Sequence, residues 1–156
     1  MGKIVGSAGI AAGADVIRNL IDTNGITVTA GNLFGVLNNK SQMFAIDPAG
    51  SMVLEVATVS GTGTDQTDAA AITAPVTVVD NNDATVGVIL PTAAAGKMMI
   101  VYAALTTAGL KIYPPTGGSI NGGTATTGSI TIEGMSAALF VGTSATNWGV
   151  AFTANT

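Results

Sequence analysis

The feature that most restricts the fold is a series of short apolar segments separated by turn residues. They occupy residues 74–80, 86–91, 97–105, 109–114, 129–133, 136–142 and 147–153. A turn about every ten residues between β-branched segments is typical of an antiparallel sandwich or jelly roll. No long helical pattern interrupts these segments, which disfavours a parallel fold built from alternating strands and helices. We therefore predict an all-β fold whose main part is an antiparallel β-sandwich or jelly-roll-like domain.

The first third of the chain is less regular. Residues 1–13 are rich in Gly and Ala without a clear period, which predicts an N-terminal arm. Apolar residues then recur at helical spacing over residues 14–22, which predicts one short helix. Shorter β patterns follow at residues 26–30, 42–46 and 52–60.

Two parts of the chain are expected from this pattern. The segment 52–60 alternates so that Met52, Leu54, Val56 and Thr58 share one face. The polar segment 61–69 (GTGTDQTDA) has no periodicity, which indicates a linker or a long loop. We therefore predict that residues 1–65 form an arm with a short β/helical segment and that residues 66–156 form the β-sandwich domain.

The scarcity of charge bears on the partners of the protein. Only 9% of the residues are charged, against about 25% in an average soluble protein. Either much of the surface is covered by a partner, with copies of the same chain as the first candidate, or Thr, Ser and Asn keep it hydrated. The five Lys and Arg residues are scattered, so no nucleic-acid partner is expected. Every apolar run is too short to span a membrane, so no membrane partner is expected either.

The composition also restricts the chemistry. The chain has no His and no Cys, which excludes a Ser–His–Asp triad and the usual zinc ligands. Two loops each pair aspartates, Asp65 with Asp68 and Asp80 with Asp83, and oxygen-rich loops of this kind can hold a cation. Neither loop has the ligand spacing of an EF-hand, and such residues are also common in turns. We therefore expect no enzyme activity, no cofactor and no metal site, with a cation near Asp80 and Asp83 left open.

The segment KIYPPTGGSINGG, residues 111–123, is predicted to end a strand and turn a sheet corner. Pro114 and Pro115 cannot donate hydrogen bonds to a neighbouring strand. Gly117 and Gly118 allow the positive φ of a tight reversal, and Ile120 is expected to be a buried plug. Tyr113 and Trp148 lie beside turns and are candidate platforms for a sugar. The candidate interface residues of the whole chain are Ile17, Leu20, Ile21, Tyr113, Ile120 and Trp148.

Four motifs in the second half of the chain carry a family resemblance. They are GVILP followed by AAGK (87–97), LKIYPPTGGSING (110–122), GMSAALFV (134–141) and WGV (148–150). With these motifs, residues 70–153 resemble the β-domain of tailed-phage virion proteins, particularly capsid decoration (cement) proteins and head-fibre proteins. The motifs belong to turns and strands and include no catalytic group.

The resemblance implies a structural virion protein that decorates the outer surface of a phage head. Such a protein is made in the host cytoplasm, binds the major capsid protein as a homotrimer and stabilises the contacts between capsomers. Residues 1–65 match nothing in these families, so their role in contacting the capsid is an inference. The alternative is a head- or tail-fibre module that binds the host surface.

Overall fold

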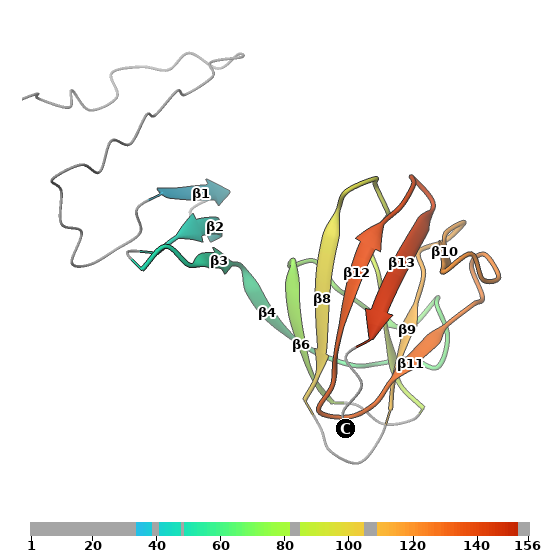
Figure 1. The fold of residues 1–156 in the computed structure, drawn as a ribbon. Coiled ribbons are helices and arrows are strands. Elements are labelled where there is room, and N and C mark those ends of the chain that lie inside the picture. The colour runs from blue at the N-terminus through green and yellow to red at the C-terminus, as the bar shows by residue number, and fades with distance from the viewer. Residues whose placement is uncertain (1–33, 39–40, 48, 82–84, 105–108, 153–156) are drawn as a thin grey trace, which may run out of the picture.

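A computed structural model describes residues 34–38, 41–47, 49–81, 85–104 and 109–152, and the structural statements below refer to these ranges. All regular secondary structure in them is β-strand, so the all-β prediction is confirmed (Figure 1). The predicted short helix at 14–22 and the predicted strand at 26–30 lie outside the described residues. The strands are β1 (Phe34–Asn38), β2 (Ser41–Ile46), β3 (Met52–Leu54), β4 (Val56–Ser60), β5 (Ala70–Ala71), β6 (Val76–Asn81), β7 (Gly87–Ile89), β8 (Met98–Ala103), β9 (Leu110–Tyr113), β10 (Ser119–Ile120), β11 (Ile130–Ile132), β12 (Ala137–Gly142) and β13 (Asn147–Phe152).

These strands form three sheets. β1, β2 and β3 make a three-stranded antiparallel sheet. A six-stranded sheet has the order β10-β13-β12-β8-β6-β4, and a four-stranded sheet has the order β11-β9-β7-β5. The six-stranded and four-stranded sheets together form the body of the protein (Figure 1).

The middle of the chain winds as a two-sheet β-solenoid. From β4 to β9 the chain alternates between the two sheets of the body, so that β4, β6 and β8 lie in one and β5, β7 and β9 in the other. Within each sheet these strands pair in parallel, as in the stacks Val56–Val76–Ile100 and Ala70–Val88–Ile112. Each pair of consecutive strands is therefore one coil, and the coils stack in register.

The prediction of an antiparallel sandwich needs correction at this point. Two parallel strands require a long crossover connection, and a helix usually supplies it. Here the crossover is a strand of the opposite sheet, so parallel pairing occurs without any helix among the described residues. Short strands with frequent turns are common to both arrangements, which is why the strand pattern did not separate them.

Antiparallel strands close one end of the solenoid. β12 pairs with β8, β13 pairs with β12, and β11 pairs with β9. The short β10 adds to the outer edge of β13 in parallel. The open ends of repeat folds need such closing elements because the last coil otherwise exposes its core.

The hydrophobic core lies between the two sheets of the body. Alternate residues of each strand point inward, as in β8, where Met99, Val101 and Ala103 are buried. The four-stranded sheet contributes Val88, Leu110, Ile112 and Ile132 to the same cluster. The largest fully buried side chains are Trp148 and Phe140, from the closing strands β13 and β12.

The three-stranded sheet projects from the body (Figure 1). β3 leads through Glu55 into β4, and none of residues 44–46 and 52–54 belongs to the core cluster of the body. β4 pairs with β6 along its whole length, so residues 56–60 belong to the six-stranded sheet of the body.

The seven segments predicted as strands from residue 74 onward are all confirmed, as β6, β7, β8, β9, β11, β12 and β13. The segment 52–60 is interrupted at Glu55 into β3 and β4, and the segment 42–46 is β2. β1, β5 and β10 were not predicted, and two of these three are only two residues long.

Candidate interaction surface

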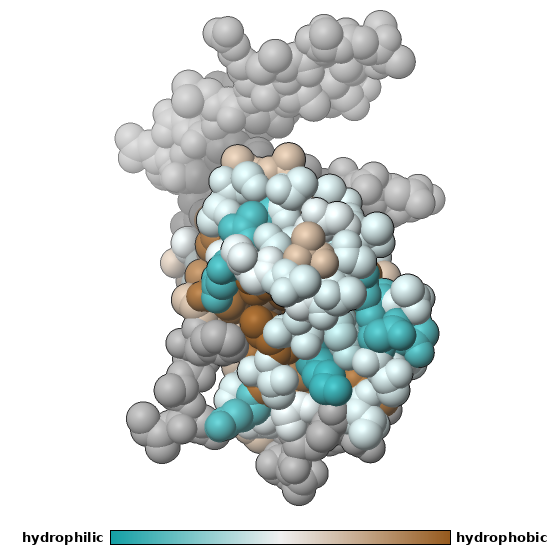
Figure 2. Space-filling view, turned by 90° about the vertical axis from the view of Figure 1, so that its right-hand side faces the viewer, coloured by the Kyte–Doolittle hydropathy of each residue, from teal (hydrophilic) through white to brown (hydrophobic). Residues whose placement is uncertain are grey.

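The outer face of the four-stranded sheet is largely polar or covered. Figure 2 looks onto this side of the body, where hydrophilic and neutral residues cover most of the surface and hydrophobic residues form a strip between them. The loop 61–69 is tied to this face by two backbone hydrogen bonds between Thr62 and Gly87. Of the two predicted alternatives, a linker or a long loop, the structure shows a loop that is held against the four-stranded sheet.

Two side chains at the end of β9 hold that loop. The Tyr113 hydroxyl donates to the backbone oxygen of Thr64 at 2.6 Å. The buried Gln66 side chain donates from Nε2 to the backbone oxygen of Pro114 at 2.6 Å. Burial raises the pKa of the Tyr113 phenol, and the nearby carboxylates of Asp65 and Asp68 raise it further. At neutral pH the phenol is thus a stable hydrogen-bond donor.

The aspartates of the loop serve its backbone. Asp68 accepts hydrogen bonds from the backbone N–H groups of Thr64 and Asp65. Asp65 accepts from the backbone N–H and the hydroxyl of Thr67, and the hydroxyl bond is the main cause that lowers the pKa of this carboxyl. Hydrogen bonds of this kind are typical of aspartates in turns, which was the alternative to cation binding.

Asp80 also has a partner within the chain. Its carboxylate accepts a 2.6 Å hydrogen bond from the Ser60 hydroxyl, while Asp83 lies outside the described residues. Within the described ranges no group of three or more acidic, His or Cys side chains is placed to hold a metal ion. No buried side-chain nitrogen or oxygen there lacks a hydrogen bond, so the described part offers no unsatisfied polar site to a ligand.

The outer face of the six-stranded sheet is apolar. The outward positions alternate with the buried ones along each strand, as in β12, where Ala137, Leu139 and Val141 are half-buried between the buried Ala138 and Phe140. Strand pairing aligns these outward residues into rows across the sheet. One row consists of Val56, Val76, Ile100, Leu139 and Ala151, and a neighbouring row of Thr58, Val78, Tyr102 and Ala137.

Charge is almost absent from this face. Among the outward residues of β4, β6, β8, β12 and β13, Asp80 is the one charged side chain, and it lies at the end of β6. Met98 begins β8 and is 56% exposed, and Val56 begins β4 and is 60% exposed. Sheets that face water normally alternate apolar with polar residues, and this outer face departs from that pattern.

The projecting sheet also has an apolar face. Phe44 pairs with Leu54 and Ile46 pairs with Met52 across β2 and β3, which places these four side chains on one face. Glu55 separates β3 from β4, so the predicted single face of Met52, Leu54, Val56 and Thr58 is divided between the projecting sheet and the six-stranded sheet of the body. Met52 is 64% exposed. We call this apolar face of the projecting sheet and the outer face of the six-stranded sheet together the outer apolar surface.

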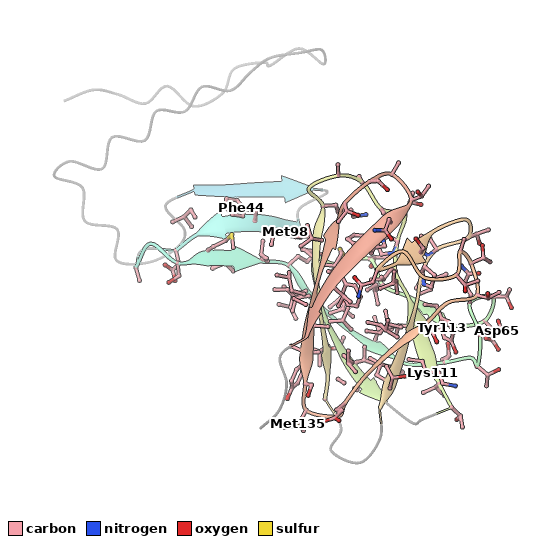
Figure 3. The ribbon with its side chains drawn as sticks, turned by 45° about the vertical axis from the view of Figure 1, so that its right-hand side comes forward. Phe44, Asp65, Met98, Lys111, Tyr113 and Met135 are labelled. Atoms are coloured by element: carbon pink, nitrogen blue, oxygen red, sulfur yellow. The ribbon has the colours of Figure 1, made fainter. Side chains whose placement is uncertain are left out.

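The two parts of the outer apolar surface meet at an angle. Figure 3 shows Phe44 on the projecting sheet and Met98 at the edge of the body next to it. Met135, the other exposed methionine of the body at 47%, lies at the opposite end. Of the other exposed large hydrophobic residues that the structure describes, Met52 begins β3 on the projecting sheet and Val56 begins β4, the strand that follows it in the body.

Three of the predicted interface residues belong to the interior. Trp148 is fully buried, its indole Nε1 donates to the backbone oxygen of Pro91 at 3.1 Å, and the Lys97 Nζ lies 5.9 Å from its ring centroid. Tyr113 and Ile120 are each 5% exposed. These side chains are therefore not available to a partner or as sugar platforms, because they complete the fold of the single chain. Ile17, Leu20 and Ile21 lie outside the described residues.

The double-proline corner confirms most of the prediction. β9 ends at Tyr113, Gly117 has a φ of +75° and Ile120 is buried in the core, but Gly118 does not have the positive φ that was expected. Asn147 secures the corner, because its Oδ1 accepts from the Ser119 hydroxyl at 2.8 Å and from the backbone N–H of Gly122 at 3.0 Å. The corner is thus a structural element that closes the solenoid.

The outer apolar surface was not predicted from the sequence, although one segment gave a signal for it. The segment 97–105 (KMMIVYAAL) is apolar on both faces of its strand, which is typical of a strand covered on both sides. Only one of those sides faces the core of the single chain. No helix that could span a membrane occurs in the part of the chain that the structure describes. Comparison of the chain with protein-family models, with curated proteins and with solved structures gave no match.

Proposed function

We propose that this chain is a structural virion protein, a capsid decoration (cement) protein that binds the outer surface of a phage head as a trimer. The observation that carries the proposal is the outer apolar surface, which consists of one face of the projecting sheet and the outer face of the six-stranded sheet, where Asp80 is the one charged group among the described outward residues. A surface of this kind suits lasting contact with protein, because burial of its apolar area lowers the free energy and few charged groups have to be desolvated.

The rest of the described structure supports a passive role. The body is a closed two-sheet core, and the loops that hold aspartates use them to bond their own backbone. A protein that braces a shell needs a rigid body, a contact with itself and a segment that binds the shell. We assign the first two tasks to the β-solenoid and the last to residues 1–35 and the nearby loops. Repetition of the contact over the shell then multiplies weak individual affinities.

Binding to phage heads tests this proposal. Heads that lack the protein are mixed with the full chain or with a variant that lacks residues 2–25, and the bound fraction is measured by co-sedimentation. We expect the full chain to bind and to raise the temperature at which the heads open, because a ligand that binds only the intact shell stabilises it. The truncated variant should remain a trimer and fail to bind.

Two results would overturn the proposal. The first is normal occupancy by the variant without residues 2–25, which would show that the arm is not the capsid contact. The second is binding of the purified protein to host cells but not to heads, which is the behaviour of a fibre module.

A further inference from the structure

We propose that a second copy of this chain covers the outer apolar surface, with the junction around Val56 and Met98 inside the contact. The inference deepens the proposed function by naming the surface through which copies associate. It concerns the free protein in solution, so it can fail or hold independently of any binding to heads.

The first argument is the exposure of these residues in the part of the chain that the structure describes. Val56 and Met98, which begin β4 and β8, are more than half exposed, and neither belongs to the core cluster. β4 is also the edge strand of its sheet among the described residues. An edge strand beside an exposed apolar face would associate with other molecules unless something covers it. A lasting contact on this face would cover both the edge strand and the exposed apolar side chains.

The second argument is the available area. With about 4.8 Å between strands and about 3.3 Å per residue, the outward face of β4, β6, β8, β12 and β13 spans on the order of 400 Å². The projecting sheet adds on the order of 200 Å² by the same measure. The sum reaches the lower end of what specific, stable interfaces bury, roughly 600 Å² per partner. It also reaches the upper end of the apolar patches that monomers expose, about 300–600 Å².

The third argument is that the surface can meet copies of itself without charge repulsion. In a cyclic trimer each copy contacts the next head to tail, and residues near the threefold axis approach the same residues of the other copies, where like charges would repel. The charged group on this face, Asp80, is at the far end of β6 from Val76 and is bonded to Ser60. Rows of Val, Ile, Leu and Met can therefore meet the same rows of a second copy without bringing like charges together.

Charge substitutions at matched methionines test this inference. The molecular mass of the intact full-length protein is measured by sedimentation equilibrium, with no heads present. We expect the wild-type protein to be oligomeric at micromolar concentration. Met98→Asp should weaken association at least about 100-fold, because an unpaired carboxylate in a protein interface is strongly disfavoured. Met135→Asp is the control, since Met135 is similarly exposed at the other end of the body, and it should leave the mass unchanged.

A second variant distinguishes loss of association from loss of folding. Thr58 is exposed on the same face in β4, and Thr58→Asp should also dissociate the oligomer while circular dichroism retains the β signal. A wild-type protein that stays monomeric at high concentration would overturn the inference. So would folded Met98→Asp and Thr58→Asp variants with the wild-type mass, or a Met135→Asp variant that dissociates as they do.

Discussion

The Tyr113 hydroxyl donates a 2.6 Å hydrogen bond to the backbone oxygen of Thr64, and this bond fastens the loop 61–69 to the end of β9. The two residues are far apart in sequence and meet because the loop folds back over the four-stranded sheet. The contact gives that sheet a fixed polar cover, while the opposite sheet of the body keeps its apolar outer face.

Removal of this hydroxyl should weaken the fold measurably. Tyr113→Phe keeps the buried ring and loses the hydrogen bond, so we expect the free energy of unfolding to fall by about 0.5–1.5 kcal/mol. Denaturant unfolding followed by circular dichroism measures the change. Tyr102→Phe is the control, because its hydroxyl contacts only the sulfur of Met135 at 3.4 Å, and it should cost less. Equal losses in the two variants would contradict the assigned role of Tyr113.

The stability of the protein should decline at alkaline pH through the same residue. The pKa of the Tyr113 phenol is raised in the folded state, so below the ordinary value of about 10 both the folded and the unfolded phenol are protonated. Above it the unfolded phenol ionises first, and the contribution is lost as the pH rises through the folded pKa. Denaturant midpoints across this range should fall more steeply for the wild type than for Tyr113→Phe. Parallel curves for the two proteins would count against this linkage.

Gly87 should not tolerate a side chain. A Cβ at this position would lie 2.5 Å from Cε2 of the Tyr113 ring and 2.8 Å from the backbone oxygen of Lys111 in the paired strand. Because a paired backbone cannot shift freely, Gly87→Ala should lower the free energy of unfolding by about 1–3 kcal/mol. Gly149→Ala is the control, since its nearest neighbour is the Thr143 methyl at 3.2 Å. A thermal unfolding scan compares the two, and a neutral Gly87→Ala would contradict the packing described here.

The chain has one tryptophan, Trp148, and its emission reports on the core directly. In the native protein the fluorescence should be that of a fully shielded indole, and unfolding should move it to longer wavelength. Trp148→Phe loses the hydrogen bond to Pro91 and part of the core volume, so the free energy of unfolding should fall by about 1–4 kcal/mol. Ready quenching of the native protein by a soluble quencher would show that Trp148 is exposed.

The positions of the strands were largely readable from the sequence, whereas their pairing was not. Alternating apolar residues and turn signals fix where a strand begins and ends, and this held from β6 to β13 apart from the very short β10. Parallel pairing in the solenoid depends on which sheet each strand joins. The stack Val56–Val76–Ile100 is unequally spaced along the chain, so no fixed repeat marked it in the sequence.

The candidate site was harder to predict for a physical reason. Tyr113, Ile120 and Trp148 are large apolar residues beside turns, and a sequence does not show whether such a residue is covered by a loop of the same chain or by a partner. Tyr113 is covered by the loop 61–69. The polar composition of this loop was equally consistent with a linker, so the contact could not be predicted. The outward residues of β8 could not be distinguished from the inward ones in the sequence, because the strand is apolar on both faces.

Methionine oxidation in the intact protein tests most directly whether a partner copy covers the outer apolar surface. In the single chain Met98 is 56% and Met135 is 47% exposed, so a monomer should oxidise both at similar rates. If a second copy covers the surface around Met98, peptide mass spectrometry after brief peroxide treatment should find Met98 protected several-fold relative to Met135. In the Thr58→Asp variant that protection should disappear. Oxidation of Met98 as fast as Met135 in the wild-type protein would contradict the central claim.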